Sequence, residues 1–200
     1  MPVFSIDEKI LMYIQDHMRC GILDKVFPAF THLGDAGIFW IVLTLILLCF
    51  KKTRRAGVCS MIALIGSVLL NNVILKPLVN RTRPYELIDG LILIGKKADD
   101  GSFPSGHAAA SIASAVALMG YLKKRYSFPL LGVALLISFS RLYIGIHYPT
   151  DVLAGIVDGI LLALLAMVIE RLLFRKWTWY KAHSSADSTI VEQDKEGARQ

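Results

Sequence analysis

Residues 56–75 read AGVCSMIALIGSVLLNNVIL, a run of twenty residues without a charged side chain. The hydrocarbon core of a bilayer is about 30 Å thick, and a helix needs about 20 apolar residues to cross it. A helix also satisfies all of its own backbone hydrogen bonds, which is the condition for lying in lipid. This stretch therefore predicts a membrane-spanning helix.

The whole chain is more apolar than an average soluble domain. Hydrophobic residues make up 54% of its 200 residues and charged residues 19%, against roughly 25% charged in soluble domains. This composition excludes a disordered chain and a coiled coil, and it disfavours a soluble monomer. The three cysteines, Cys20, Cys49 and Cys59, are too few for a disulfide framework, and no pair of them has the spacing of metal ligands.

Further apolar runs flank the first one. Together they predict five spans, at about 34–51, 56–76, 104–122, 127–146 and 149–174. We therefore expect an all-α fold, a polytopic membrane bundle of five to six transmembrane helices. The membrane domain is expected over residues 34–176, followed by a polar tail over 177–200 whose composition is typical of disorder.

The segment 1–33 precedes the first expected span. On a helix over residues 5–18, one face carries Ile6, Ile10, Tyr13, Ile14 and Met18, and the opposite face carries Asp7, Glu8, Lys9 and Asp16. This pattern predicts an amphipathic helix that lies in the outer membrane interface. Residues 22–33 are expected to dip into the membrane beside it, or to contribute to a sixth span. The chain does not open with the pattern of a cleaved signal peptide.

The net charge of +6 is gathered in clusters between the apolar runs, so it does not point to a nucleic acid partner. The clusters are Lys51, Lys52, Arg54 and Arg55; Lys123, Lys124 and Arg125; and Arg171, Arg175, Lys176 and Lys181. Alternation of the spans places all three on one side, which the positive-inside rule makes cytoplasmic. We expect a multi-pass protein of the plasma membrane with a cytoplasmic C-terminus, and with residues 77–103 and the turn near 147 facing outward.

Ionisable residues also gather at the outward ends of the expected spans. They are Lys76, Arg81, Arg83, His107, Arg141, His147 and Asp151. Each alone has a structural explanation, such as a snorkelling lysine, a loop arginine or a residue at a helix end. Charged groups at the edge of a bilayer are costly and by default mark a functional site. Their common depth favours one shared site.

Such a cluster suits phosphate chemistry. Arginine forks and a lysine bind phosphoryl oxygens, and the run Pro104–His107 opens an expected helix whose amides can hold an anion. Two histidines offer a nucleophile and a general acid, and Asp151 lies four residues after His147, where it can orient the ring. A zinc site of two histidines and an aspartate is disfavoured because the surrounding cations would repel the metal.

Three motifs within residues 76–151 carry a resemblance to a known family. Lys76-x6-Arg83-Pro84, Pro104-Ser105-Gly106-His107 and Ser140-Arg141-x5-His147-x3-Asp151 resemble the signatures of the type 2 phosphatidic acid phosphatase family. This superfamily also includes vanadium haloperoxidases and bacterial acid phosphatases. The resemblance implies an all-helical membrane core, an outward-facing site, and no metal or other cofactor.

The resemblance also implies roles for the motif residues. His147 would attack phosphorus to form a phosphohistidine, with Asp151 orienting it, and His107 would protonate the leaving oxygen. The phosphate would be held by Lys76, Arg83, Ser105, Gly106 and Arg141. Arg81 lies outside the motifs and is a candidate substrate contact. The loop 85–103, which includes Asp100, is expected to cover the site.

The expected partners are a phosphorylated lipid and the lipids of the membrane. The chain is similar to small bacterial undecaprenyl diphosphate phosphatases, so undecaprenyl diphosphate is the expected substrate. Phosphatidylglycerophosphate or phosphatidate is the alternative. A transporter, a silent lipid-binding protein and a haloperoxidase fit the pattern less well. Asp158, inside the last span, is expected to hydrogen-bond Asn71 or Asn72, with a role in the lipid pocket or a proton route as the alternative.

Overall fold

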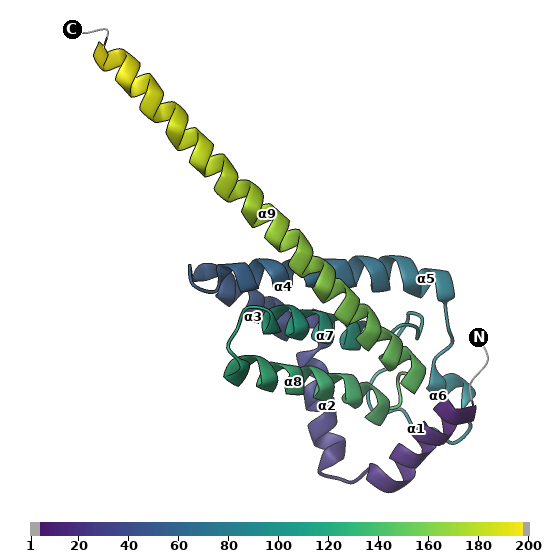
Figure 1. Cartoon of the computed structure of the whole chain (residues 1–200). Helices are drawn as coiled ribbons and strands as arrows, with labels where there is room; N and C mark the ends of the chain where they lie inside the picture. The colour runs from purple at the N-terminus through teal and green to yellow at the C-terminus, as the bar shows by residue number, and fades with distance from the viewer. Residues whose placement is uncertain (1–4, 198–200) are drawn as a thin grey trace.

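The structure is a computed structural model, and it describes the backbone of residues 5–197 and the side chains of residues 5–35 and 37–176. All regular structure in this range is helical, so the expected all-α class is confirmed (Figure 1). The elements are α1 Ser5–Met18, α2 Leu23–Leu33, η1 Asp35–Gly37, α3 Ile38–Cys49, α4 Arg54–Ser67, η2 Val68–Leu75, α5 Lys76–Val79, α6 Pro84–Leu87, α7 Gly106–Met119, α8 Lys124–Tyr143 and α9 Pro149–Gly197.

Three stretches of the described chain are long and apolar enough to cross a membrane: Arg54–Leu87, Lys124–Tyr143 and Pro149–Lys176. A fourth arises if α2 and α3, bent by 47° at the intervening turn, form one broken span. The expected span over 104–122 appears as the shorter apolar helix α7. The exact number of spans therefore stays a prediction.

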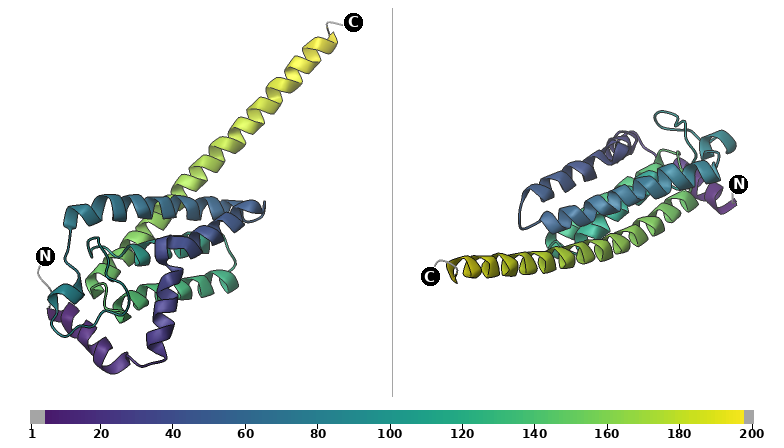
Figure 2. Two further views of the ribbon diagram at one scale, coloured as in Figure 1. Left: turned by 180° about the vertical axis from the view of Figure 1, so that it is seen from behind. Right: turned by 90° about the horizontal axis from the view of Figure 1, so that it is seen from above.

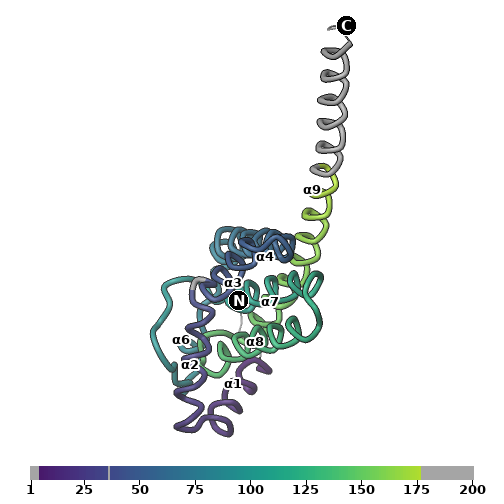
Figure 3. The backbone as a smooth tube through the Cα atoms, turned by 90° about the vertical axis from the view of Figure 1, so that its left-hand side faces the viewer, coloured from purple at the N-terminus to yellow at the C-terminus, as the bar shows by residue number. Residues whose placement is uncertain are grey.

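Helix α7 is the centre of the bundle. It lies between α4 and α8 (Figure 3) and also packs against α9, which in turn contacts α4 (Figure 2). The buried residues of α7 are mostly small: Ala108, Ala109, Ser111, Ile112, Ala113, Ser114, Ala115, Ala117 and Leu118. Small side chains let helix backbones approach closely in a membrane, where packing rather than the hydrophobic effect holds helices together.

The closest approach is between α7 and α9. A Cβ added at Gly155 would lie 2.6 Å from the carbonyl oxygen of Ser105, and one added at Gly159 would lie 2.7 Å from that of Ala109. Only glycine fits at these two positions, one helical turn apart. The beginning of α7 is thereby pressed against the first turns of α9.

Helix α1 buries one residue of the face that its sequence pattern predicts to be polar. Asp7, Leu11 and Ile14 are its buried residues, whereas Ile6 and Tyr13 are 63% and 59% exposed. The expectation that Asp7 lies on the polar, solvent-facing side was wrong. The reason is an ion pair with Arg81, whose guanidinium lies 3.0 Å from the Asp7 carboxylate.

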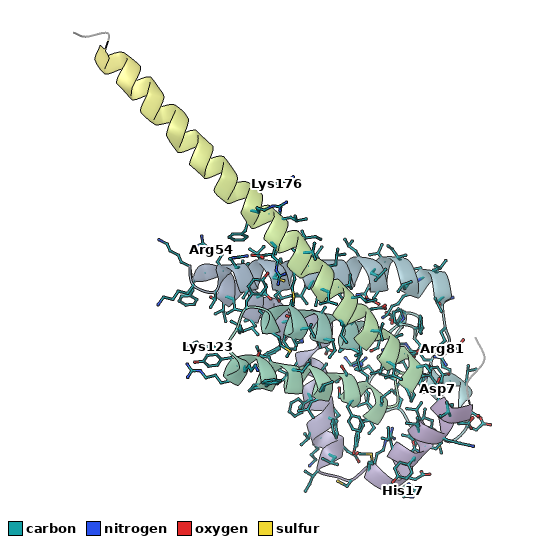
Figure 4. The ribbon with its side chains drawn as sticks, viewed as in Figure 1. Asp7, His17, Arg54, Arg81, Lys123 and Lys176 are labelled. Carbon is teal, nitrogen blue, oxygen red and sulfur yellow. The ribbon has the colours of Figure 1, made fainter. Side chains whose placement is uncertain are left out.

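The two ends of the bundle differ in charge. Figure 4 shows Arg54 and Lys123, from two of the basic clusters, at the end opposite to Asp7 and Arg81. At the basic end, Arg55 donates to the fully buried Glu170 at 2.6 Å, and the Tyr121 hydroxyl donates to the same carboxylate at 2.5 Å. This contact joins α4 and the turn after α7 to α9.

Beyond Lys176 the structure describes no side chain. The backbone of α9 is described as far as Gly197, whereas the tail 177–200 was expected to be disordered from its composition.

The α7–α9 approach predicts a stability effect. Gly159→Ala should lower the free energy of unfolding by about 1–3 kcal/mol, because its methyl group would push two helix backbones apart. Thermal unfolding in detergent measures this. The control is Gly132→Ala in α8, where a Cβ would meet nothing within 4 Å, and which should be neutral or stabilising by up to about 1 kcal/mol. Equal behaviour of the two variants would contradict the close approach.

Candidate active site

The ends of five elements bring the motif residues together at one end of the bundle. Lys76 opens α5, Arg83 precedes α6, Ser105–His107 open α7, Arg141 ends α8, and Asp151 lies in the first turn of α9. His147 lies in the turn between α8 and α9. The Ser105 amide donates to the carbonyl of Asp151 at 3.1 Å, so the second and third motifs are joined directly through their backbones.

His147 is buried, with its two ring nitrogens in different surroundings. Nδ1 lies 3.6 Å from Asp151 Oδ2 and 3.4 Å from the Ser102 hydroxyl, and Nε2 lies 3.5 Å from Nη1 of Arg83. The carboxylate side favours a proton on Nδ1, which leaves the lone pair on Nε2. The Asp151 contact is longer than a hydrogen bond, and Ser102 bridges the two groups by donating to Asp151 at 2.5 Å.

The charge state of His147 suits a nucleophile. Burial lowers its pKa to about 3, with the nearby charges of Arg141 and Arg83 acting in the same direction and Asp151 opposing them. The imidazole is therefore the neutral free base at neutral pH. An unprotonated ring nitrogen is what attack on phosphorus requires.

Asp151 is fully buried and well satisfied. It accepts hydrogen bonds from Arg81 at 2.6 Å, from Ser102 at 2.5 Å and from the Tyr148 amide at 3.0 Å. A buried carboxylate is tolerated when it is paired in this way. Its position at the start of α9 is thus held from three directions.

Arg81 is used within the protein. Besides Asp151 it contacts Asp7 at 3.0 Å and the Thr150 hydroxyl at 2.8 Å, and it lies over the Tyr148 ring at 3.8 Å. Both terminal nitrogens are occupied by these partners, whereas Nε of Arg81 is buried without a hydrogen-bond partner among the described residues. In this structure Arg81 contacts Asp151, and its role as a substrate contact stays a prediction.

Lys76 and Arg83 share a single carboxylate, that of Asp100. Lys76 pairs with Asp100 Oδ2, and Arg83 donates to Asp100 Oδ1 at 2.6 Å. Burial disfavours the charged form of Asp100, but its bonds to Lys76 and Arg83 outweigh burial and lower its pKa to about 2. The two carboxylate oxygens of Asp100 thus pair with Lys76 and Arg83, the two cations that the family resemblance predicts to bind phosphate.

Some buried polar atoms near the start of α7 and the end of α8 lack partners. Nη1 of Arg141 donates to the Thr31 hydroxyl at 2.5 Å, but Nε of Arg141 and the hydroxyl of Ser105 are buried without a hydrogen-bond partner among the described residues. Buried polar groups are rarely left unpaired. Donors of this kind beside the N-terminus of α7 fit an anion.

A cavity of about 640 Å³ lies at this end of the bundle. Its polar end is lined by Lys76, Asp100, Gly106 and His107. Its remaining wall is mostly apolar and comes from α3, α4 and η2, with Ile41, Met61, Leu64, Ile65, Val68 and Leu69. Lys76 and the N-terminus of α7 therefore lie at one end of a cavity that is otherwise mostly apolar. Within the described side chains, His, Cys, Asp and Glu residues form no group of three or more with metal-ligand geometry.

Comparison with known proteins places this site in a family. Residues 56–175 match the sequence profile of the PAP2 superfamily. The chain belongs to the PAP2 superfamily. An undecaprenyl-diphosphatase of Sulfolobus acidocaldarius is 36% identical over 133 residues, which cover 66% of this chain and 63% of that protein. Phosphatidylglycerophosphatase B of Bacillus subtilis is 34% identical over 156 residues, covering 72% of this chain and 73% of that one.

Solved PAP2 structures share the fold. LpxE of Aquifex aeolicus superposes with a TM-score of 0.74 at 27% identity, covering 82% of this chain and 96% of that chain. The PAP2-type phosphatidylglycerolphosphate phosphatase of Bacillus subtilis gives a TM-score of 0.67 at 29% identity, with 84% and 85% covered. Both likenesses support the membrane bundle described above.

Several residues at the PAP2 site were not predicted from the sequence as site residues. Ser102 and Asp35, which contacts His107, carry no signal in the motifs, and the acidic Asp100 was expected only as part of a covering loop. The expected bond between Asp158 and Asn71 is not formed, because the Asn71 amide donates to the Ser67 carbonyl at 3.1 Å. Asn72 instead lies against Gly106, where an added Cβ would be 2.9 Å from its side-chain oxygen.

The Asp100 contacts predict an effect on anion affinity. Asp100→Asn should lower the inhibition constants of inorganic phosphate and vanadate by roughly two- to fivefold, because partly exposed ion pairs contribute up to about 1 kcal/mol. Inhibition of phosphate release measures this. Asp99→Asn, at an exposed neighbouring position, is the matched control and should change nothing. Weaker inhibition in Asp100→Asn would show that the carboxylate helps to arrange the cations.

The Asp7–Arg81 pair predicts a structural effect. Asp7→Asn should cost about 3 kcal/mol of stability, since it leaves a buried guanidinium with one carboxylate fewer. Thermal unfolding in detergent would report it as a lower midpoint. Asp16→Asn, on an exposed position of the same helix, should leave the midpoint unchanged, and a similar fall in both would argue against the ion pair.

Proposed function

We propose that this chain is an integral-membrane lipid phosphate phosphatase that works through a phosphohistidine on His147. The observation that carries the proposal is the site's position. Lys76, Asp100 and His107 line the polar end of a cavity whose other wall is mostly apolar. Behind this end, Arg83 joins Asp100 to the neutral, buried imidazole of His147. This arrangement fits a ligand with a phosphate head and a hydrocarbon chain.

The geometry supports a two-step reaction. In the first step, Nε2 of His147 attacks phosphorus as the bond to the leaving oxygen breaks, and His107 gives that oxygen a proton. In the second step, water attacks the phosphohistidine and returns a proton to His107, which releases inorganic phosphate and His147. Lys76, Arg83, Arg141 and the Ser105 hydroxyl, with the N-terminus of α7, would stabilise the charge on the phosphoryl oxygens.

For the substrate we propose undecaprenyl diphosphate, which would be converted to undecaprenyl phosphate. Support comes from the Sulfolobus acidocaldarius relative and from the undecaprenyl-diphosphatase BcrC of Bacillus subtilis, which is 29% identical over 149 residues. The second candidate is phosphatidylglycerophosphate or phosphatidate, favoured by the similarity to phosphatidylglycerophosphatase B. Both have the phosphate head and the apolar body that the cavity suits.

We further propose a plasma-membrane location with the site on the extracytoplasmic side and the C-terminus in the cytoplasm. The support is the arrangement of charges: Arg54 and Lys123 lie at the end opposite to Arg81 (Figure 4), and basic residues collect on the cytoplasmic side of membrane proteins.

The test is phosphate release by the full-length protein, purified in detergent, with EDTA present. Undecaprenyl diphosphate, phosphatidylglycerophosphate and phosphatidate are compared side by side, with His147→Ala as the control. We expect release that resists EDTA and is lost, by at least about 10³-fold, in the variant because the nucleophile is missing. The ranking of kcat/KM selects the substrate. Release from no lipid, or release that survives His147→Ala, would overturn the proposal.

A further inference from the structure

The ring of His107 is held by the N-terminal segment, which precedes the range matched by the superfamily. Nε2 of His107 lies 3.0 Å from Oδ1 of Asp35 in η1. The neighbouring Gly34 also touches the ring, since a Cβ added there would lie 2.7 Å from Cδ2 of His107. The turn between α2 and α3 therefore packs closely against the His107 ring.

The Asp35 carboxylate is itself fixed by a second contact. Its Oδ2 lies 2.7 Å from Nδ1 of His32 at the end of α2. The His32 side chain is 73% exposed and that of Asp35 48% exposed, whereas that of His107 is 21% exposed. Asp35 thus stands between a surface group and a ring that lines the cavity.

This contact leaves His107 with one ring nitrogen for chemistry. Because Nε2 faces Asp35, Nδ1 is the nitrogen left to face a leaving oxygen. A general acid must carry a proton at that atom, so the ring must be an imidazolium when the bond breaks. The other charges that act on the ring are Arg141 of α8 and Lys76 of α5. Both are positive, and Asp35 is the negative charge that counters them.

We propose that Asp35 is a positioning residue for His107: it holds the ring with Nδ1 toward the substrate and stabilises the imidazolium that donates the proton. The inference rests on the proposed phosphatase function. It gives the site two histidine–carboxylate pairs, one behind the nucleophile and one behind the acid. The second carboxylate comes from a part of the chain that carries none of the three motifs.

The test compares Asp35→Asn with Asp35→Glu in the full-length protein, on the lipid phosphate that the wild type hydrolyses best. Asp35→Asn should lower kcat by roughly 10- to 100-fold, by analogy with the loss of carboxylates that orient metal-bound histidines, with little change in KM. Asp35→Glu should recover part of kcat because it restores the carboxylate. Asp89→Asn removes a charge at an exposed position and should match the wild type.

The pH profile of kcat separates positioning from damage to the fold. In Asp35→Asn the alkaline limb should move to lower pH by about one unit, because an imidazolium without its counter-ion loses its proton more readily. A nitrophenyl phosphate that carries an alkyl chain gives a second readout. Its leaving group needs little protonation, so Asp35→Asn should lose less activity on it than on the lipid.

The outcomes are distinguishable. Wild-type kcat with an unshifted profile in Asp35→Asn would overturn the role of Asp35 while leaving the phosphatase proposal intact. An equal loss on both substrates at every pH, without recovery in Asp35→Glu, would show a structural role and overturn it as well. The phosphatase proposal itself would be overturned by the phosphate-release experiment. The result that overturns it is a wild type that releases no phosphate, or a His147→Ala variant that still releases it.

Discussion

The arrangement of the site depends on the close contact between α7 and α9. At Gly155 and Gly159, the α9 backbone lies so close to the carbonyls of Ser105 and Ala109 that no side chain would fit between them. This contact places the N-terminus of α7, which suits an anion, beside the turn that carries His147. In lipid, where the hydrophobic effect does not drive helices together, such packing and the buried hydrogen bonds around it hold the geometry.

Around this contact, buried charge is paired in a chain. Asp7 pairs with Arg81, Arg81 with Asp151, and Asp151 with Ser102 beside His147. Each charged member is costly to bury alone. The Arg81 guanidinium is shared by the two carboxylates, and Asp151 also accepts a hydrogen bond from Ser102. The opposite end of the bundle has a comparable contact between Arg55 and Glu170. The apolar helices are therefore joined at both ends by ion pairs that fix how they lie against each other.

The sequence was sufficient for the all-α class and for the convergence of three motifs at one end, since apolar runs and charge clusters are properties of single segments. It was not sufficient to predict the burial of Asp7 in α1. An amphipathic pattern predicts that every carboxylate is exposed, and the partner that buries Asp7 is Arg81, 74 positions away. Asp35 and Ser102 were missed for the same reason: their roles come from partners distant in sequence. The span count stays open because α7 is short for a bilayer and α2–α3 is bent.

Asp100 affects how strongly the site binds anions from solution. Its carboxylate is tethered beside Lys76 and Arg83, so it acts as an internal ligand at high effective concentration. A small free anion must displace the Asp100 carboxylate from Lys76 and Arg83, and it makes no other contact that would offset the loss of these ion pairs. In the proposed function, a phosphorylated lipid would also place its chain against the apolar wall of the cavity, and that contact would offset the loss. The same competition would favour departure of inorganic phosphate once the lipid has left, so a site rich in positive charge need not stay occupied by the product.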